Sequence, residues 1–227
     1  MLAGAVLLAA CAPVPRAPAP GTGTLWGYVH AVPRAGVTPG RRPADSYADR
    51  RLRDVEFVDY RRPGFAVVYV EGEPPPAGNG RLIIEGSLLG ARFAPAYAAV
   101  GVGGRVVLRN ADWVAHTVSC PSAGFLHRLA PGEEGELPTR VSGAAPVFLL
   151  DAPRVQGLLF VSPGPYAVAS PEGRWELPDL PPGPRRLHAW HPRLPPGSSE
   201  TEVQSGRATR VDLDVGVGNL DLHEQTP

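Results

Sequence analysis

Residues 100–125 read VGVGGRVVLRNADWVAHTVSCPSAGF, and this stretch holds two turns and two short apolar strands in close succession. Glycines form a first turn, an apolar run follows at 106–108, and a second turn lies at Asn110–Asp112. A short strand carrying His116 comes next. Strands joined by an Asn-x-Asp turn are typical of a Greek-key β-sandwich, so we expect the imidazole of His116 near one end of such a sandwich.

The composition favours an all-β fold. Of the 227 residues 43% are hydrophobic and only 19% are charged, which argues against a disordered chain. The 28 Pro and 27 Gly are spread between short apolar runs, as expected where many turns join short strands. All 22 basic residues are Arg and are balanced by 22 acidic residues, so no net charge favours a nucleic-acid partner.

The N-terminal segment has the features of an export signal. Residues 1–10, MLAGAVLLAA, are apolar but fall short of the roughly 20 residues that span a bilayer. They fit the hydrophobic region of a signal peptide instead, although they lack the Arg or Lys that usually stands at the start of such a peptide. The alternative is a buried N-terminal strand.

Residues 8–11, Leu-Ala-Ala-Cys, resemble a bacterial lipobox. That resemblance implies a lipidated Cys11 at the mature N-terminus, a bilayer as a partner, and a lipid-anchored location in the bacterial cell envelope, facing the periplasm. Residues 11–23 would then be a Pro-rich tether. Cys120 would have no cysteine left to pair with.

Strands are expected at 24–32 and 64–72, and from Arg81 onward short strands follow at the spacing of a sandwich. Residues 33–63 hold eight Arg among several acids. We interpret them as a self-neutralising surface excursion; the alternative is a surface for a partner or for lipid headgroups. Residues 201–217 are expected to close the chain as a further hairpin.

Two family resemblances meet in this chain. The pattern Phe93-x-Pro95, then residues 100–103, then 106–112 and His116-Thr117-Val118, resembles the cupredoxin-like (plastocyanin-like, methylamine-utilisation-type) periplasmic proteins. The run PYAVASPEGRWELPDLPPGPRRLHAWHP (165–192) resembles the carboxypeptidase regulatory-like, or transthyretin-like, sandwich. Together the resemblances imply a regulatory-like sandwich over residues 24–79 and 164–216, interrupted by a cupredoxin-like domain over 80–163. Two consecutive domains are the alternative.

The cupredoxin resemblance also implies where copper would bind. Its first His ligand matches His116, and its Cys, His and Met ligands fall in the segment LLDAPRVQGLLFV (149–161). There the matching positions are Leu149, Ala152 and Val155, none of which can coordinate a metal. We therefore expect no copper, and no other cofactor.

A rebuilt metal site is the alternative, and its ligands would be His116, Cys120 and His127. Cys120 follows His116 by four residues, so an extended strand would put both on one face but roughly 13 Å apart. The other interpretation is a half-buried imidazole and a small buried thiol.

No segment resembles a serine nucleophile elbow, a phosphate-binding glycine loop or an HExxH zinc helix, so we do not expect an enzyme. The sequence predicts an anchored periplasmic lipoprotein whose copper-free cupredoxin-like domain binds or scaffolds a periplasmic protein. One alternative is a copper electron-transfer protein with atypical ligands. Another is a carbohydrate-binding module using Trp175 or Trp190, which rests on fold analogy.

Overall fold

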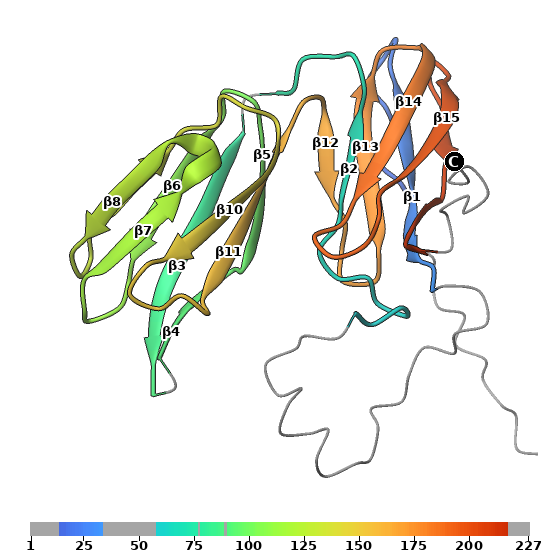
Figure 1. Ribbon diagram of the computed structural model, residues 1–227. Coiled ribbons are helices and arrows are strands. Elements are labelled where there is room, and N and C mark those ends of the chain that lie inside the picture. The colour runs from blue at the N-terminus through green and yellow to red at the C-terminus, as the bar shows by residue number, and fades with distance from the viewer. Residues whose placement is uncertain (1–13, 34–57, 77, 89, 218–227) are drawn as a thin grey trace, which may run out of the picture.

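The computed structural model describes residues 14–33, 58–76, 78–88 and 90–217, and the statements below concern these residues. Strands and turns make up nearly all of this part of the chain, with one short 3-10 turn, η1 (Pro121–Ala123). The all-β fold class predicted from the sequence is confirmed (Figure 1).

The first sandwich is built from strands at both ends of the described chain. Its two sheets have the orders β13-β1-β16, with β17 also paired to β1, and β12-β2-β14-β15. Its strands are β1 (Gly23–Ala31), β2 (Val67–Val70), β12 (Tyr166–Val168), β13 (Arg174–Leu180), β14 (Gly183–Trp190), β15 (Gly197–Val203), β16 (Ala208–Arg210) and β17 (Leu213–Val215).

The second sandwich is formed by the chain between β2 and β12. Its sheets have the orders β4-β3-β6-β9 and β5-β11-β10-β7-β8. Its strands are β3 (Asn79–Ser87), β4 (Gly90–Phe93), β5 (Tyr97–Gly101), β6 (Arg105–Asn110), β7 (His116–Cys120), β8 (Phe125–Leu129), β9 (Glu134–Leu137), β10 (Gly143–Leu149) and β11 (Gln156–Ser162).

Each sandwich has its own hydrophobic core, and the alternation of side chains along each strand explains why. In β6, Val106 and Leu108 are buried between the sheets, whereas Arg105 and Arg109 point outward and are exposed. The outward face of the β4-β3-β6-β9 sheet carries ion pairs such as Arg81–Glu134 at 3.2 Å and Arg105–Glu136 at 3.0 Å. This face is therefore a solvated one.

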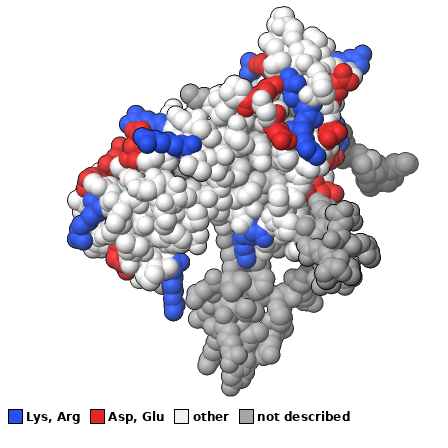
Figure 2. All heavy atoms as spheres, turned by 45° about the horizontal axis from the view of Figure 1, so that its top comes forward, with Lys and Arg blue, Asp and Glu red and all other residues white. Residues whose placement is uncertain are grey.

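The outward face of the other sheet of the second sandwich meets the first sandwich along β5 and β11. Phe160 in β11 is 4% exposed because Trp190 and Tyr69 of the first sandwich cover it, with ring centroids 4.4 and 5.7 Å away. Phe65 stacks on Tyr97 beside them, at 5.4 Å. In Figure 2, charged side chains gather mainly at two sides of the view, and a broad surface without charged side chains lies between them.

The expected closing hairpin over residues 201–217 is wrong. β15 pairs with β14 in one sheet, whereas β16 and β17 pair in parallel with β1 in the opposite sheet. The chain crosses between the sheets because Val203 on one side and Leu213 on the other are both buried in the core between them. A hairpin would have left one of these two side chains on an outer face.

The two tryptophans suggested for carbohydrate binding differ in their exposure. Trp175 is 1% exposed in the core of the first sandwich. Trp190 lies against Phe160 at the junction of the two sandwiches. The carbohydrate hypothesis is therefore wrong for Trp175, whereas for Trp190, which is partly exposed, it stays a prediction.

Several sequence predictions fall outside the described residues. They include the signal peptide at 1–10, the lipidation site Cys11 and residues 34–57 of the Arg-rich excursion. Part of the tether is described, and its backbone N–H groups at Arg16 and Ala19 donate to Glu176 and Asp179 of β13, both at 2.8 Å. Within the described ranges, no helix has the length and apolar character needed to cross a bilayer.

Candidate functional site

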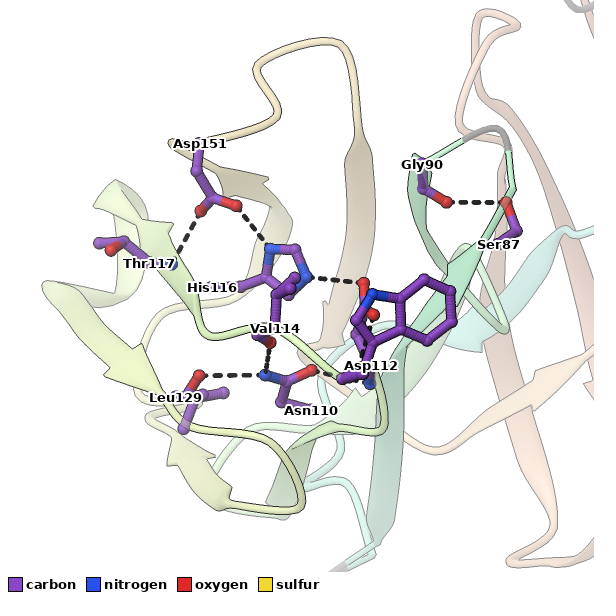
Figure 3. Close-up of polar contacts among 10 residues, drawn as sticks. Ser87, Gly90, Asn110, Asp112, Val114, His116, Thr117, Leu129 and Asp151 are labelled. Atoms are coloured by element: carbon purple, nitrogen blue, oxygen red, sulfur yellow. Dashed lines mark hydrogen bonds and ion pairs between the residues drawn. The ribbon is translucent and has the colours of Figure 1, made fainter.

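His116, the first residue of β7, lies between two carboxylates (Figure 3). Its Nε2 atom is 2.9 Å from Oδ2 of Asp112, and its Nδ1 atom is 2.5 Å from Oδ2 of Asp151. The side chains of His116 and Asp112 are each 4% exposed, while that of Asp151 is 43% exposed. We call these three residues the Asp–His–Asp cluster.

The turn between β6 and β7 positions Asp112. The side-chain amide of Asn110 donates to the carbonyl oxygens of Val114 and Leu129, at 2.7 and 3.0 Å. Its oxygen accepts from the Asp112 N–H at 2.9 Å, an Asx-type turn. Asp112 Oδ1 in turn accepts from the N–H of Trp113 at 2.6 Å, which leaves Oδ2 aimed at His116.

A glycine on the neighbouring strand makes room for the Asp112 carboxylate. A Cβ atom at Gly86 in β3 would lie 2.1 Å from Asp112 Oδ1, far closer than side chains approach. Gly86 therefore allows the carboxylate to pack against the β3 backbone.

The third member, Asp151, comes from the loop between β10 and β11. Its Oδ1 atom accepts the Thr117 N–H at 2.9 Å, while the Leu150 N–H donates to the Thr117 carbonyl at 2.9 Å. These bonds fasten the loop to β7. They also explain how one side chain from a loop reaches an imidazole 35 residues away in sequence.

The cluster favours a charged imidazole. Burial alone would lower the pKa of His116, but the hydrogen bonds and charges of Asp112 and Asp151 outweigh burial and raise that pKa above its ordinary value. For Asp151, burial would raise the pKa, yet the Thr117 N–H and His116 lower it below the usual range. Both ring nitrogens then donate to carboxylates, so neither keeps a lone pair for a metal or a base reaction.

The three positions matched to copper ligands lie in the same loop region. Leu149 is fully buried in the core of the second sandwich, and Ala152 and Val155 pack against that core. The loop is closed by backbone bonds from Ala152 N–H to Leu149 O at 3.2 Å and from Val155 N–H to Ala152 O at 2.8 Å. It keeps a compact turn next to His116 but offers apolar side chains there.

The alternative ligand set His116, Cys120 and His127 is not brought together. Cys120 is buried and its Sγ atom contacts Ser122 Oγ at 3.7 Å, while His127 faces Glu133 at 3.4 Å. In the part of the chain that the structure describes, no three His, Cys, Asp or Glu side chains are grouped to hold a metal ion. Asp112 and Asp151 contact opposite nitrogens of one ring, so they do not converge on a point that an ion could fill.

The cluster is bordered by exposed apolar side chains. Trp113 follows Asp112 and is 69% exposed, Val114 comes next, and Leu150 precedes Asp151. Leu88, fully exposed, lies in the hairpin between β3 and β4, two residues after the Gly86 that contacts Asp112. We call Leu88, Trp113, Val114 and Leu150 the apolar rim.

Sequence reasoning missed both carboxylates, although signals for them exist. Asp112 precedes His116 by four residues across a turn, close enough for the side chains to meet. Asp151 is the single carboxylate in the loop where the metal ligands were sought. A search for partners of the imidazole, in addition to partners of a metal, would have found it.

No protein-family model matches the chain, and no curated protein sequence matches it. Solved structures that match are cupredoxins. A purple cupredoxin from Nitrosopumilus maritimus has 22% identity and a TM-score of 0.33, over 36% of this chain and 98% of its own. A copper(I) amicyanin mutant has 17% identity and a TM-score of 0.31, over 42% and 98%, and a mutant fern plastocyanin has 16% and 0.29, over 35% and 99%.

Proposed function

We propose that this chain is a lipid-anchored protein of the bacterial cell envelope that binds a protein partner through the end of its second sandwich. In this proposal the second sandwich is a cupredoxin-like domain without copper, and the first is a regulatory-like sandwich that holds it away from the membrane. Cys11 carries the lipid, and the chain has no catalytic activity of its own.

The observation that carries the proposal is the apolar rim beside the hydrogen-bonded Asp–His–Asp cluster. An exposed Trp beside three exposed aliphatic side chains is costly in water and is typical of a contact surface. Trp is also among the residues that contribute most to binding energy at interfaces. The hydrogen bonds of the cluster keep the two loops in place, which reduces the entropy lost on binding.

Charge indicates what the partner surface looks like. Two carboxylates and one imidazolium leave the cluster with one net negative charge, and Asp151 is its partly exposed member. A partner with an apolar patch beside an Arg or Lys would complement both the rim and this charge. We therefore commit to a protein partner over a bilayer or a sugar.

A photo-crosslinking experiment in the native envelope tests this proposal. A photoreactive aromatic amino acid replaces Trp113, and the control position is Arg92, which pairs with Glu85 on the charged sheet face at 2.8 Å. We expect one discrete crosslinked product from position 113, and this product should disappear in the Leu150→Asp variant. The partner identified in the product, once purified, should bind the full chain directly. Equal labelling from both positions, or no discrete product from position 113, would contradict the proposal.

Copper binding is the competing function, and absorption spectroscopy separates the two. Cu(II) added to the full chain should produce no thiolate-to-copper charge-transfer band, because Cys120 is buried away from the ring nitrogens of His116. A band that is lost in Cys120→Ser would establish a copper centre and overturn the copper-free proposal.

A further inference from the structure

A second site lies at the junction of the two sandwiches, away from the apolar rim. A cavity of about 240 Å³ opens there between the segment that leads into β2, the segment that follows β14, and the first residue of β5. The lining residues that matter here are Arg62, Pro63, Phe65, Tyr97, His191 and Arg193. Tyr97 belongs to the second sandwich, so the cavity is complete only when both sandwiches are in place.

A buried imidazole fixes the floor of this cavity. His191 is 6% exposed, its Nε2 atom donates to the Pro63 carbonyl at 2.9 Å, and its Nδ1 atom accepts the Arg193 N–H at 3.1 Å. Burial lowers the pKa of His191, which fits a neutral ring that donates once and accepts once. The ring therefore joins two segments that are 128 residues apart in sequence. One segment carries Arg62 next to Pro63 and the other carries Arg193, so the ring fixes the backbone beside both arginines.

Two arginine side chains that line the cavity have no partner of opposite charge among the described residues. Within the described ranges, neither Arg62 nor Arg193 has a side-chain ion pair or hydrogen bond. Asp59 also lines the cavity, and its carboxylate accepts the backbone N–H of Arg61 at 2.9 Å, so the charged side chains of the lining leave one net positive charge. Two guanidinium groups at one small cavity favour an anion, and the planar guanidinium fork suits a carboxylate in particular.

Two aromatic side chains form an apolar wall of the cavity, which favours a ligand with an apolar part. Phe65 and Tyr97 stack with ring centroids 5.4 Å apart and an interplanar angle of 23°, and both line the cavity. A flat ring of a ligand can extend such a stack. The volume is below the roughly 300–1,000 Å³ of pockets for drug-sized ligands, so it suits a molecule of about one ring.

We propose that this cavity binds a small aromatic carboxylate, with its carboxylate held by Arg62 and Arg193 and its ring against Phe65 and Tyr97. Because the two walls come from different sandwiches, the bound ligand bridges them. Binding therefore stabilises the junction in addition to the folded state.

Isothermal titration of the full chain with benzoate tests the proposal, with benzamide, acetate and phenyl phosphate as comparison ligands. Benzoate should bind with measurable affinity. Benzamide, which lacks the charge, and acetate, which lacks the ring, should each bind at least about tenfold more weakly, since each loses one half of the site. Equal binding of benzamide or acetate would overturn the proposal, and tighter binding of phenyl phosphate would overturn its choice of a carboxylate.

Variants link the affinity to the cavity. Arg62→Gln and Arg193→Gln should each weaken benzoate roughly tenfold or more, as expected for a lost charged hydrogen bond. Phe65→Leu should weaken benzoate but leave the weak acetate binding unchanged. The matched control is Arg61→Gln, because Arg61 is exposed like Arg62, is adjacent to it and is not part of the lining. Affinity that survives both lining variants, or falls equally in Arg61→Gln, would contradict the site.

Discussion

The Nδ1 atom of His116 lies 2.5 Å from Oδ2 of Asp151, and this contact joins the start of β7 to the loop after β10. An ion pair links the two elements, and Asp112 contacts the other side of the ring. We therefore expect the Asp–His–Asp cluster to be charged and to contribute to the stability of the fold.

Removing the charge of Asp151 should weaken the fold. Asp151→Asn keeps the shape but takes a carboxylate from a charged hydrogen bond, so we expect a loss of about 1–2 kcal/mol in the free energy of unfolding. Partial exposure of Asp151 keeps the loss at the lower end. Urea unfolding measures it, and Glu200→Gln is the control, because the Arg186–Glu200 pair is exposed and long, at 3.9 Å. An equal change in both variants would count against the cluster.

The stability supplied by the cluster should depend on pH in a defined direction. Because the folded pKa of His116 is raised, its contribution is fully present below about pH 6.5, the pKa of unfolded His, and is lost as pH rises through the folded pKa. Because the folded pKa of Asp151 is lowered, its contribution is present above about pH 3.9 and is lost as pH falls through that folded pKa. The cluster should therefore stabilise most between these limits.

Unfolding of the wild type and of His116→Gln across pH isolates this effect. The buried His191 also titrates, with a lowered folded pKa, and its contribution falls below about pH 6.5 in both proteins alike. The stability difference between the two proteins should be largest near pH 5 and should shrink at alkaline pH. A difference that stays constant with pH would mean that folding leaves the pKa of His116 unchanged, and a difference that falls toward acidic pH would mean that the folded protein holds His116 neutral.

Gly86→Ala should disturb the cluster by displacing the carboxylate of Asp112. The new Cβ atom would meet Asp112 Oδ1 at 2.1 Å, so the carboxylate must move away and its bond to His116 must weaken. We expect a loss of about 1–3 kcal/mol, typical of overpacking, together with a lower pKa of His116. Gly135→Ala is the matched control, because its Cβ atom would meet its nearest neighbour at an ordinary 3.4 Å. Unchanged stability in Gly86→Ala would show that Asp112 is free to shift.

The junction between the sandwiches should depend on Phe160. Phe160→Ala removes the ring that contacts Trp190 and Tyr69, and we expect a loss of about 3–5 kcal/mol, in the range of buried Phe truncations. Phe148→Ala on the same outward sheet face should cost less, because Phe148 is only partly buried. Tryptophan fluorescence during urea unfolding follows the change through Trp190. Equal losses in both variants would mean that the sandwiches do not depend on this contact.

The sequence was sufficient to predict the fold class and most strands, because the alternation of apolar residues and the Gly and Pro turns are local signals. Residues 105–110 and 116–120, for example, become β6 and β7 as expected. The last strands were mispredicted as a hairpin because the choice of partner strand depends on Leu213 and Val203 sharing one core, which no local pattern reports.

Local signals also predict one part of the candidate site, the place of His116, but not its partners. The position of His116 at one end of the sandwich follows from the turn at Asn110 and the strand after it. Its link to Asp151 does not, because that contact joins residues 35 apart through loop geometry. The absence of ligand side chains at Leu149, Ala152 and Val155 can be read directly from the sequence, but what stabilises the loop in their place cannot.

The most direct test of this account is the protonation of His116, followed by ¹⁵N-detected NMR of the histidine rings as pH is raised. The account predicts that both ring nitrogens of His116 remain protonated at neutral pH and that Cu(II) leaves their signals unchanged. A neutral ring with one unprotonated nitrogen at neutral pH, or signals that Cu(II) broadens at His116 before the other histidines, would contradict it.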